Sequence, residues 1–196
     1  LWQCCNSKDN SHTINRFDKD LLYISENYTD SAFSVFDNRY ADLFSIYYHS
    51  LLKGSSDSLD SKSKIEFISS ILKNSHFNKL YNDVIQEFAN MEEEEIILSK
   101  ASDRYSKIFK DSYIPKIYTH VSPFGYSIIT SDSLISISLD NYLGCDYEGY
   151  DGIFYKYQLP KKERKMIVPD IFRGWIYAKY PHKQTSLIDG MIYEGA

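Results

Sequence analysis

The chain has no long apolar run and no excess of positive charge. None of its segments approaches the 18 or so consecutive apolar residues that a membrane-spanning helix needs. Its 22 Lys and Arg residues against 27 Asp and Glu residues give a net charge of −5. Such a chain lacks the general attraction to a polyanion on which nonspecific nucleic-acid binding depends. We therefore expect no nucleic-acid partner.

Glycine and proline are also scarce, at 8 and 5 of 196 residues, which excludes collagen-like and low-complexity chains. Apolar residues make up 43% of the chain and charged residues 25%, as in a globular protein. A chain of this length is expected to form one domain with a sizeable core. Aromatic residues are abundant, with 18 Tyr, 11 Phe and 2 Trp, and the tyrosine hydroxyls need water or a hydrogen-bond partner.

Cysteine is rare, and its positions are informative. The odd set of Cys4, Cys5 and Cys145 has no C-x-x-C spacing, so neither a disulfide framework nor a zinc ribbon is predicted. We interpret Cys145 as a buried free thiol. Cys4 and Cys5 precede a polar stretch at 6–13 that is typical of a tether, and residues 1–5 (LWQCC) are similar to the tail of a bacterial lipoprotein signal. We predict that Cys4 or Cys5 carries lipid; the alternative is a pair of unmodified thiols in a frayed terminus.

The periodicity of apolar residues predicts a helical first half. From Phe33 to Leu51 they recur at spacings of three and four, which indicates a helix from Thr29 or Asp30 to about Leu52. The other segments expected in this half are a strand or short helix at 14–24, a loop at 54–64, and helices at 63–73, 75–88 and 92–110.

After Pro115 the pattern changes from helix to strand. Three β-rich runs, at 116–121, 126–130 and 134–139, are joined by short turns that predict a meander. The last run alternates apolar residues with Ser136 and Ser138, which is typical of a sheet with one solvent-facing side.

Two helices, at about 169–179 and 186–196, are expected to close the chain. The order of elements predicts an α+β fold: an N-terminal helical part, a small antiparallel or mixed sheet, and then helices.

The motifs of common enzymes are missing. There is no G-x-S-x-G, no phosphate-binding loop and no H-E-x-x-H, and the five histidines are not spaced for chelation. No catalytic residue, metal site or cofactor is therefore predicted.

Acidic residues and tyrosines alternate between 140 and 151, and they are candidates for lining a ligand cleft. These candidates are Asp140, Tyr142, Asp146, Tyr147, Glu148 and Tyr150. The alternative is a turn-rich loop pinned by its aromatic rings. In that interpretation Asp140 ends a strand and caps the turn that follows, and its replacement by alanine costs about 1 kcal/mol.

Several segments together carry a family resemblance. They are 14–21 (INRFDKDL), 136–150 (SISLDNYLGCDYEGY), 158–160 (QLP), 171–181 (IFRGWIYAKYP) and 186–196 (SLIDGMIYEGA), and 139–144 is the most specific piece. In this order and spacing they resemble the gliding-motility lipoprotein GldB family of Bacteroidota and, through it, the zincin-like metallopeptidase fold.

The resemblance implies a peptidase-like fold without an intact metal site. The helix at 169–179 takes the place of the H-E-x-x-H helix, and it carries neither His nor Glu. Glu194, in the sequence Glu194-Gly195-Ala196, resembles the acidic corner that supplies a third zinc ligand in active relatives. A catalytic zinc needs about three protein ligands, so we expect no bound zinc. Family members are longer, which implies that a C-terminal segment is missing.

These inferences predict a non-catalytic, lipid-anchored protein of the cell envelope. It would consist of a tether at 1–13 and a single domain at 14–196, with a helical half to about 112 and the sheet and later helices from about 113. The expected partners are the membrane, through the lipid, and other envelope proteins. Two alternatives stay open: a divergent zincin-like metallopeptidase with ligands outside this sequence, and a saccharide- or peptide-binding module.

Overall fold

The computed structural model describes residues 13–52, 54, 59–109, 114–182 and 186–195. The first part of the chain forms β1 (Ile14–Asn15), α1 (Phe17–Glu26), α2 (Asp30–Ile46), a π-helical turn (Tyr47–Leu51), α3 (Ser61–Leu72), α4 (Ser75–Glu87) and α5 (Glu92–Ile108). The second part forms β2 (Lys116–His120), β3 (Ile128–Thr130), β4 (Leu134–Ser138), α6 (Ile167–Lys179) and α7 (Leu187–Gly195). Four 3-10 turns lie between β4 and α6, at Leu139–Tyr142, Glu148–Tyr150, Leu159–Lys161 and Arg164–Met166. The predicted α+β fold is confirmed.

Side-chain caps from Thr29, Asp60 and Asn74 explain where α2, α3 and α4 begin. The hydroxyl of Thr29 accepts a hydrogen bond from the backbone N–H of Ala32 at the start of α2. Asp60 accepts one from Ser63 at the start of α3, so the loop predicted at 54–64 ends earlier than expected. Each such cap satisfies a backbone donor that the first helical turn leaves free. The segment at 14–24, which fitted a strand or a helix, contains both β1 and most of α1.

The four-stranded sheet is mixed, in the order β1-β2-β4-β3. β1 pairs with β2 and β2 with β4 in parallel, while β3 and β4 form an antiparallel hairpin. The predicted meander is therefore wrong: β4 adds to β2 and leaves β3 on the outer edge. The inner strands are β2 and β4, and β4 is buried along its whole length, whereas the three residues of β3 at the edge are half-exposed.

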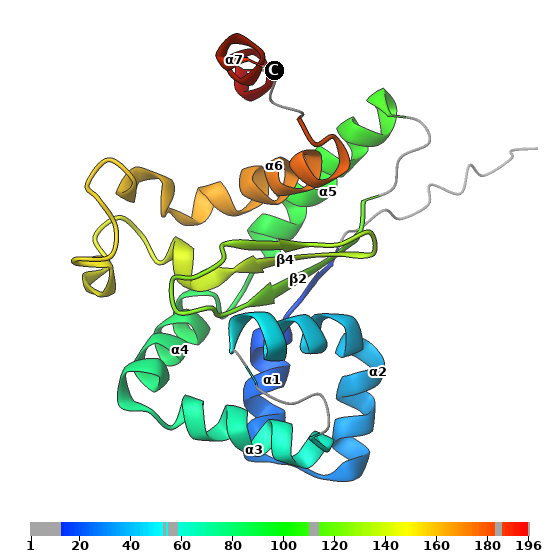
Figure 1. Ribbon diagram of the computed structural model, residues 1–196, viewed down its shortest axis with the longest axis vertical. Helices are drawn as coiled ribbons and strands as arrows, with labels where there is room; N and C mark the ends of the chain where they lie inside the picture. The colour runs from blue at the N-terminus through cyan, green and yellow to red at the C-terminus, as the bar shows by residue number, and fades with distance from the viewer. Residues whose placement is uncertain (1–12, 53, 55–58, 110–113, 183–185, 196) are drawn as a thin grey trace, which may run out of the picture.

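Figure 1 shows the sheet between two groups of helices, with α1 to α4 on one side and α5 and α6 on the other. Because both faces are covered, the expectation of a solvent-facing side is wrong. Ser136 and Ser138 are fully buried, and their alternation with apolar residues reflects a polar cluster inside the protein. α7 lies beyond α6 in Figure 1.

A buried ion pair ties the start of the chain to the sheet. Asp18 of α1 is fully buried and pairs with the Arg16 guanidinium at 2.6 Å. Its carboxylate also accepts a hydrogen bond from Thr119 of β2, and Arg16 donates to the backbone carbonyl of Phe88, just after α4. The pair joins elements that are distant in sequence, and the hydrogen bonds around it offset the cost of burying charge.

Candidate functional site

The candidate site is a groove between the turn that joins α3 to α4 and the loop that follows β4. Its volume is about 870 Å³. We call it the α4 groove, and its lining residues are Ser70, Ile71, Asn74, His76, Phe77, Lys79, Leu80, Pro123, Phe124, Tyr147, Glu148, Gly149 and Ile153. A partly apolar concave surface with a few polar groups is the usual form of a ligand site.

Two of the candidate residues, Tyr147 and Glu148, line the α4 groove. The Tyr147 hydroxyl donates to Asp83 Oδ2 at 2.7 Å, and Lys79 Nζ donates to the same oxygen at 2.9 Å. Burial opposes ionisation of Asp83, but these two hydrogen bonds outweigh it and hold the pKa of the carboxyl below its usual value. Burial and the bond to Asp83 raise the pKa of Tyr147. The wall of the groove is thus a fixed network that presents the Tyr147 ring.

Tyr150 lies behind this wall and does not line the groove. Its buried hydroxyl donates to the backbone carbonyl of Asp140 at 2.8 Å and accepts from the N–H of Leu143 at 2.9 Å. Its ring is 5.1 Å from that of Tyr147 and 5.5 Å from that of Phe124, in edge-to-face contacts. Tyr150 therefore holds two groove-lining rings in place.

Asp140 is fully buried and holds the turn that carries Phe124 into the groove. Its carboxylate accepts hydrogen bonds from the N–H groups of Ser122 at 3.0 Å and Phe124 at 2.5 Å, and from the Ser138 hydroxyl. Phe124 has a φ of 60° and Pro123 a φ of 23°, a backbone that needs such support. The expectation that Asp140 caps the turn after it is wrong, because its carboxylate oxygens accept from the 122–124 turn instead. Burial raises the pKa of Asp140, against the effect of its hydrogen bonds.

The remaining candidates lie elsewhere. The Tyr142 hydroxyl donates to Asp170 of α6 at 2.8 Å inside the protein. Asp146 is exposed and does not line the groove. The side chain of Glu194, like Cys4 and Cys5, lies outside the described part of the protein.

Cys145 is half-buried, so its predicted burial is wrong. Gly144 before it has a φ of 101°, which turns the chain outward.

The buried polar cluster beneath the groove was missed from the sequence. His120 of β2 is fully buried, with Nδ1 2.8 Å from the Ser136 hydroxyl and Nε2 3.3 Å from the carbonyl oxygen of Tyr126. Beside it, the Ser138 hydroxyl lies 2.8 Å from that of Ser122. Burial lowers the pKa of His120 to about 4, so the imidazole is neutral at pH 7. The cluster follows from the parallel pairing of β2 with β4, which places His120 opposite Ser138. The sequence carries no local signal for that pairing.

The sequence as a whole matches one family model. The model of the gliding motility protein GldB covers residues 4–196. The chain belongs to the GldB family. No curated protein and no solved structure matches it.

The segments that carry the GldB resemblance form the framework of the fold. The segment 14–21 contains β1 and the buried pair of Arg16 and Asp18, and 139–144 contains the turn after β4. The segment 136–150 also contains Tyr147, Glu148 and Gly149, which line the α4 groove.

The described residues of this GldB-family protein do not fit a zinc site. Within that part of the chain, no three His, Cys, Asp or Glu side chains are grouped so that they could hold a metal ion. α6, which the zincin resemblance places at the metal, has Arg173 ion-paired to Asp170 at 2.6 Å and a buried Trp175. No helix in the described ranges is long and apolar enough to cross a bilayer.

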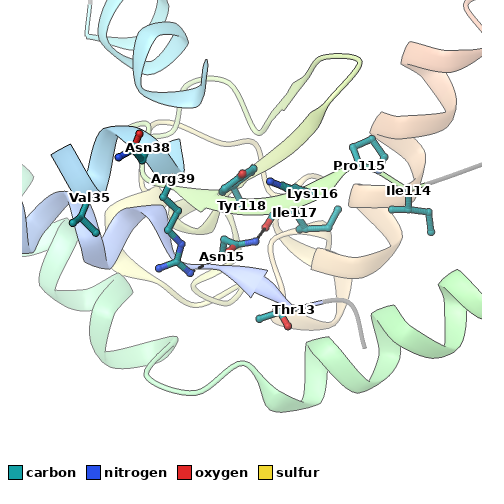
Figure 2. A pocket seen from close by; sticks show the side chains of 10 residues that line it. All are labelled: Thr13, Asn15, Val35, Asn38, Arg39, Ile114, Pro115, Lys116, Ile117 and Tyr118. Atoms are coloured by element: carbon teal, nitrogen blue, oxygen red, sulfur yellow. Dashed lines mark hydrogen bonds between the residues drawn. The ribbon is translucent and has the colours of Figure 1, made fainter. Parts of the chain in front are cut away.

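A second cavity, of about 780 Å³, lies at the β1 edge of the sheet. Figure 2 shows Arg39 of α2 reaching across it to Asn15. Its guanidinium donates to Asn15 Oδ1 and to Asp20 Oδ2, both at 3.1 Å. Thr13, where the predicted tether meets the domain, also lines this cavity, together with Ile114 and Pro115. The lining of this cavity includes none of the candidate residues between 140 and 151, so the α4 groove remains the candidate site.

Proposed function

We propose that this protein is a lipid-anchored component of the cell envelope that serves gliding motility or envelope assembly by binding other envelope components, without catalysis. The family match over residues 4–196 carries the proposal, because it includes the cysteine pair as well as the whole folded part. In support of a role without catalysis, the carboxylates of Asp83, Asp140 and Asp170 are already engaged. Each accepts a hydrogen bond from a tyrosine hydroxyl or a backbone N–H and so holds that group in place.

Replacing both Cys4 and Cys5 by serine in the precursor is expected to release the protein from the membrane fraction. Acyl chains contribute about 0.8 kcal/mol per buried methylene, so the loss of several chains abolishes anchoring. Immunoblots of fractionated cells measure the result, and the two single substitutions identify the modified residue. Cys145→Ser is the matched control and should stay with the membranes. Membrane association that persists in the double variant would contradict the anchor.

The α4 groove favours one alternative, a saccharide- or peptide-binding module. Its aromatic residues and fixed Tyr147 offer a stacking surface, and Glu148 at its rim offers a polar contact. We expect soluble peptidoglycan fragments or short peptides from a library to shift the NMR signals of groove residues. Tyr147→Ala should then weaken binding about tenfold or more. Tyr155→Ala, an exposed ring outside the lining, is the control; equal affinity for both variants argues against the groove.

The zincin-like fold stays a prediction, and so does the metallopeptidase alternative that depends on it. Its support is the position of α6 and the sequence Glu194-Gly195-Ala196. Because the described residues do not fit a zinc site, we assign no step of a reaction to this protein.

A further inference from the structure

The C-terminal ends of α5 and α6 meet and expose a cluster of large apolar side chains. Phe109, which caps α5, has its ring centroid 6.2 Å from that of Tyr180, which caps α6. We call the cluster the α5–α6 tip. Its exposed members are Ile108, Phe109, Ile176, Tyr177 and Tyr180, and Ile108 is 72% exposed. Exposed apolar groups gathered in this way mark contact surfaces more often than single ones do.

The tip is a built surface rather than two frayed ends. The ring of Tyr105 is 4.8 Å from that of Phe109 and 6.2 Å from that of Phe172. The Lys179 ammonium lies 5.6 to 5.8 Å from the ring centroids of Tyr105, Trp175 and Tyr180. The Lys179 ammonium also donates to the Tyr105 hydroxyl at 3.3 Å, so cation–π contacts and a hydrogen bond hold the rings of the two helices together.

The charge of the tip is opposite to that of the chain. The last two turns of α5 expose Lys100, Arg104 and Lys107, with Asp103 as the acidic residue among them, while the whole protein carries −5. Exposed apolar and aromatic groups beside basic ones are the composition of surfaces that lie in the headgroup layer of a bilayer. In an acidic protein, an exposed basic and apolar surface of this kind is attracted to anionic lipid while the acidic surface is repelled.

The tip also lies at the end of the molecule where the tether enters. Phe109 of the tip and Ile114 are five residues apart, so they lie within about 18 Å of each other, and Ile114 and Pro115 line the same cavity as Thr13 (Figure 2). If Cys4 or Cys5 carries lipid, the eight residues at 6–13 span at most about 3.3–3.6 Å each. The domain is then held within about 30 Å of the bilayer by the end that carries the tip.

We propose that the α5–α6 tip docks the domain on an anionic phospholipid bilayer, with its apolar side chains in the headgroup layer and the exposed Arg104 and Lys107 facing the lipid phosphates. The bilayer is favoured over a second copy of the chain by the basic charge, which would repel an identical tip, and by the position of Thr13. The orientation of the docked domain rests on the proposed lipid anchor. The affinity of the tip for lipid does not, because it can be measured without the anchor.

The test uses the full chain with Cys4 and Cys5 replaced by serine, so that no lipid is attached. It is sedimented with vesicles of phosphatidylethanolamine and phosphatidylglycerol, and with vesicles of phosphatidylcholine. We expect binding to the anionic vesicles. Ile108→Ser combined with Phe109→Ser should weaken binding to the anionic vesicles at least tenfold, since burying one large apolar side chain strengthens binding by about tenfold or more. Arg104→Glu combined with Lys107→Glu should weaken it at least about tenfold on anionic vesicles and change little on phosphatidylcholine.

The matched control is Tyr155→Ser combined with Tyr157→Ser, which removes two rings that are 71% and 75% exposed away from the tip. It should bind like the parent chain. Thermal melts separate loss of binding from loss of folding. If the variant with Ile108→Ser and Phe109→Ser unfolds, the variant with Arg104→Glu and Lys107→Glu still tests the proposal. No binding by the parent, or equal binding by tip and control variants, overturns the proposal. The proposal is also overturned if the protein is a dimer in solution and the tip variants dissociate that dimer but leave vesicle binding unchanged. The fate of the precursor with both cysteines replaced, in cells, is a separate result that decides the anchor.

Discussion

Replacing Asp140 by alanine is expected to lower the free energy of unfolding by about 2–6 kcal/mol, because two backbone N–H groups lose their acceptor and each unsatisfied group costs about 1–3 kcal/mol. The donors are the N–H groups of Ser122 and Phe124, whereas the Ser138 hydroxyl can still donate to that of Ser122 at 2.8 Å. This exceeds the cost of about 1 kcal/mol expected for a helix or turn cap. For a protein of this size the melting temperature should fall by about 10 °C, as measured by circular dichroism.

Asp146→Ala is the control for this prediction. Asp146 lies on the loop that follows Asp140 but is exposed, and its removal should change the free energy of unfolding by less than about 0.5 kcal/mol. Asp140→Asn keeps one acceptor oxygen and should fall between the two. Equal melting temperatures for Asp140→Ala and Asp146→Ala would show that the 122–124 turn does not need the carboxylate.

His120 is expected to make the protein less stable as the pH falls from about 6.5 to about 4. Burial lowers the pKa of His120 from 6.5 to about 4, so in this window the unfolded chain binds a proton that the folded protein does not. Its contribution to stability is complete above pH 6.5 and is lost progressively as the pH falls toward the folded pKa. The loss reaches about 3 kcal/mol, from about 1.4 kcal/mol per pKa unit.

Asp140 acts in the opposite direction, because its raised pKa lets the folded protein take up a proton more readily than the unfolded chain. The effect of His120 is therefore isolated by comparison with His120→Gln, which cannot titrate but can still donate to Tyr126. Urea unfolding of both proteins at neutral and at mildly acidic pH gives the two slopes. If the variant loses as much stability as the parent, the buried imidazole is not the group responsible.

The helices could be predicted from the sequence because their signals are local. A cap such as Thr29 and an apolar stripe such as that from Phe33 to Phe44 lie within one helix, and α2 follows both. The sheet could not be predicted in the same way. No residue near β4 in the sequence shows that it pairs with β2 in parallel. Ser136 and Ser138 therefore gave the pattern of a solvent-facing side, although their hydroxyls form hydrogen bonds inside the protein.

Only the part of the candidate site that lies within one segment of the sequence could be predicted. The loop after β4 combines tyrosines and acids within a few residues, and this marked Tyr147 and Glu148. The opposite wall, with His76 and Phe77, is formed by the start of α4, some seventy residues away in the chain. No spacing within the sequence joins those two segments. The supporting role of Asp140 was also hidden, because the β3–β4 hairpin separates it in the sequence from Ser122 and Phe124.

The pairing of β1 with β2 has a consequence for how the chain folds. β1 is two residues long, yet its partners in β2 are about a hundred residues further on, as in the bond from Asn15 to the carbonyl of Ile117. All of α1 to α5 lies in the loop that this contact closes. Local helical turns form in microseconds or less, whereas a contact across so long a loop waits for a large loss of chain entropy. We therefore expect the pairing of β1 with β2 to form after the local helical contacts, and these long-range contacts raise the mean contact order of the protein.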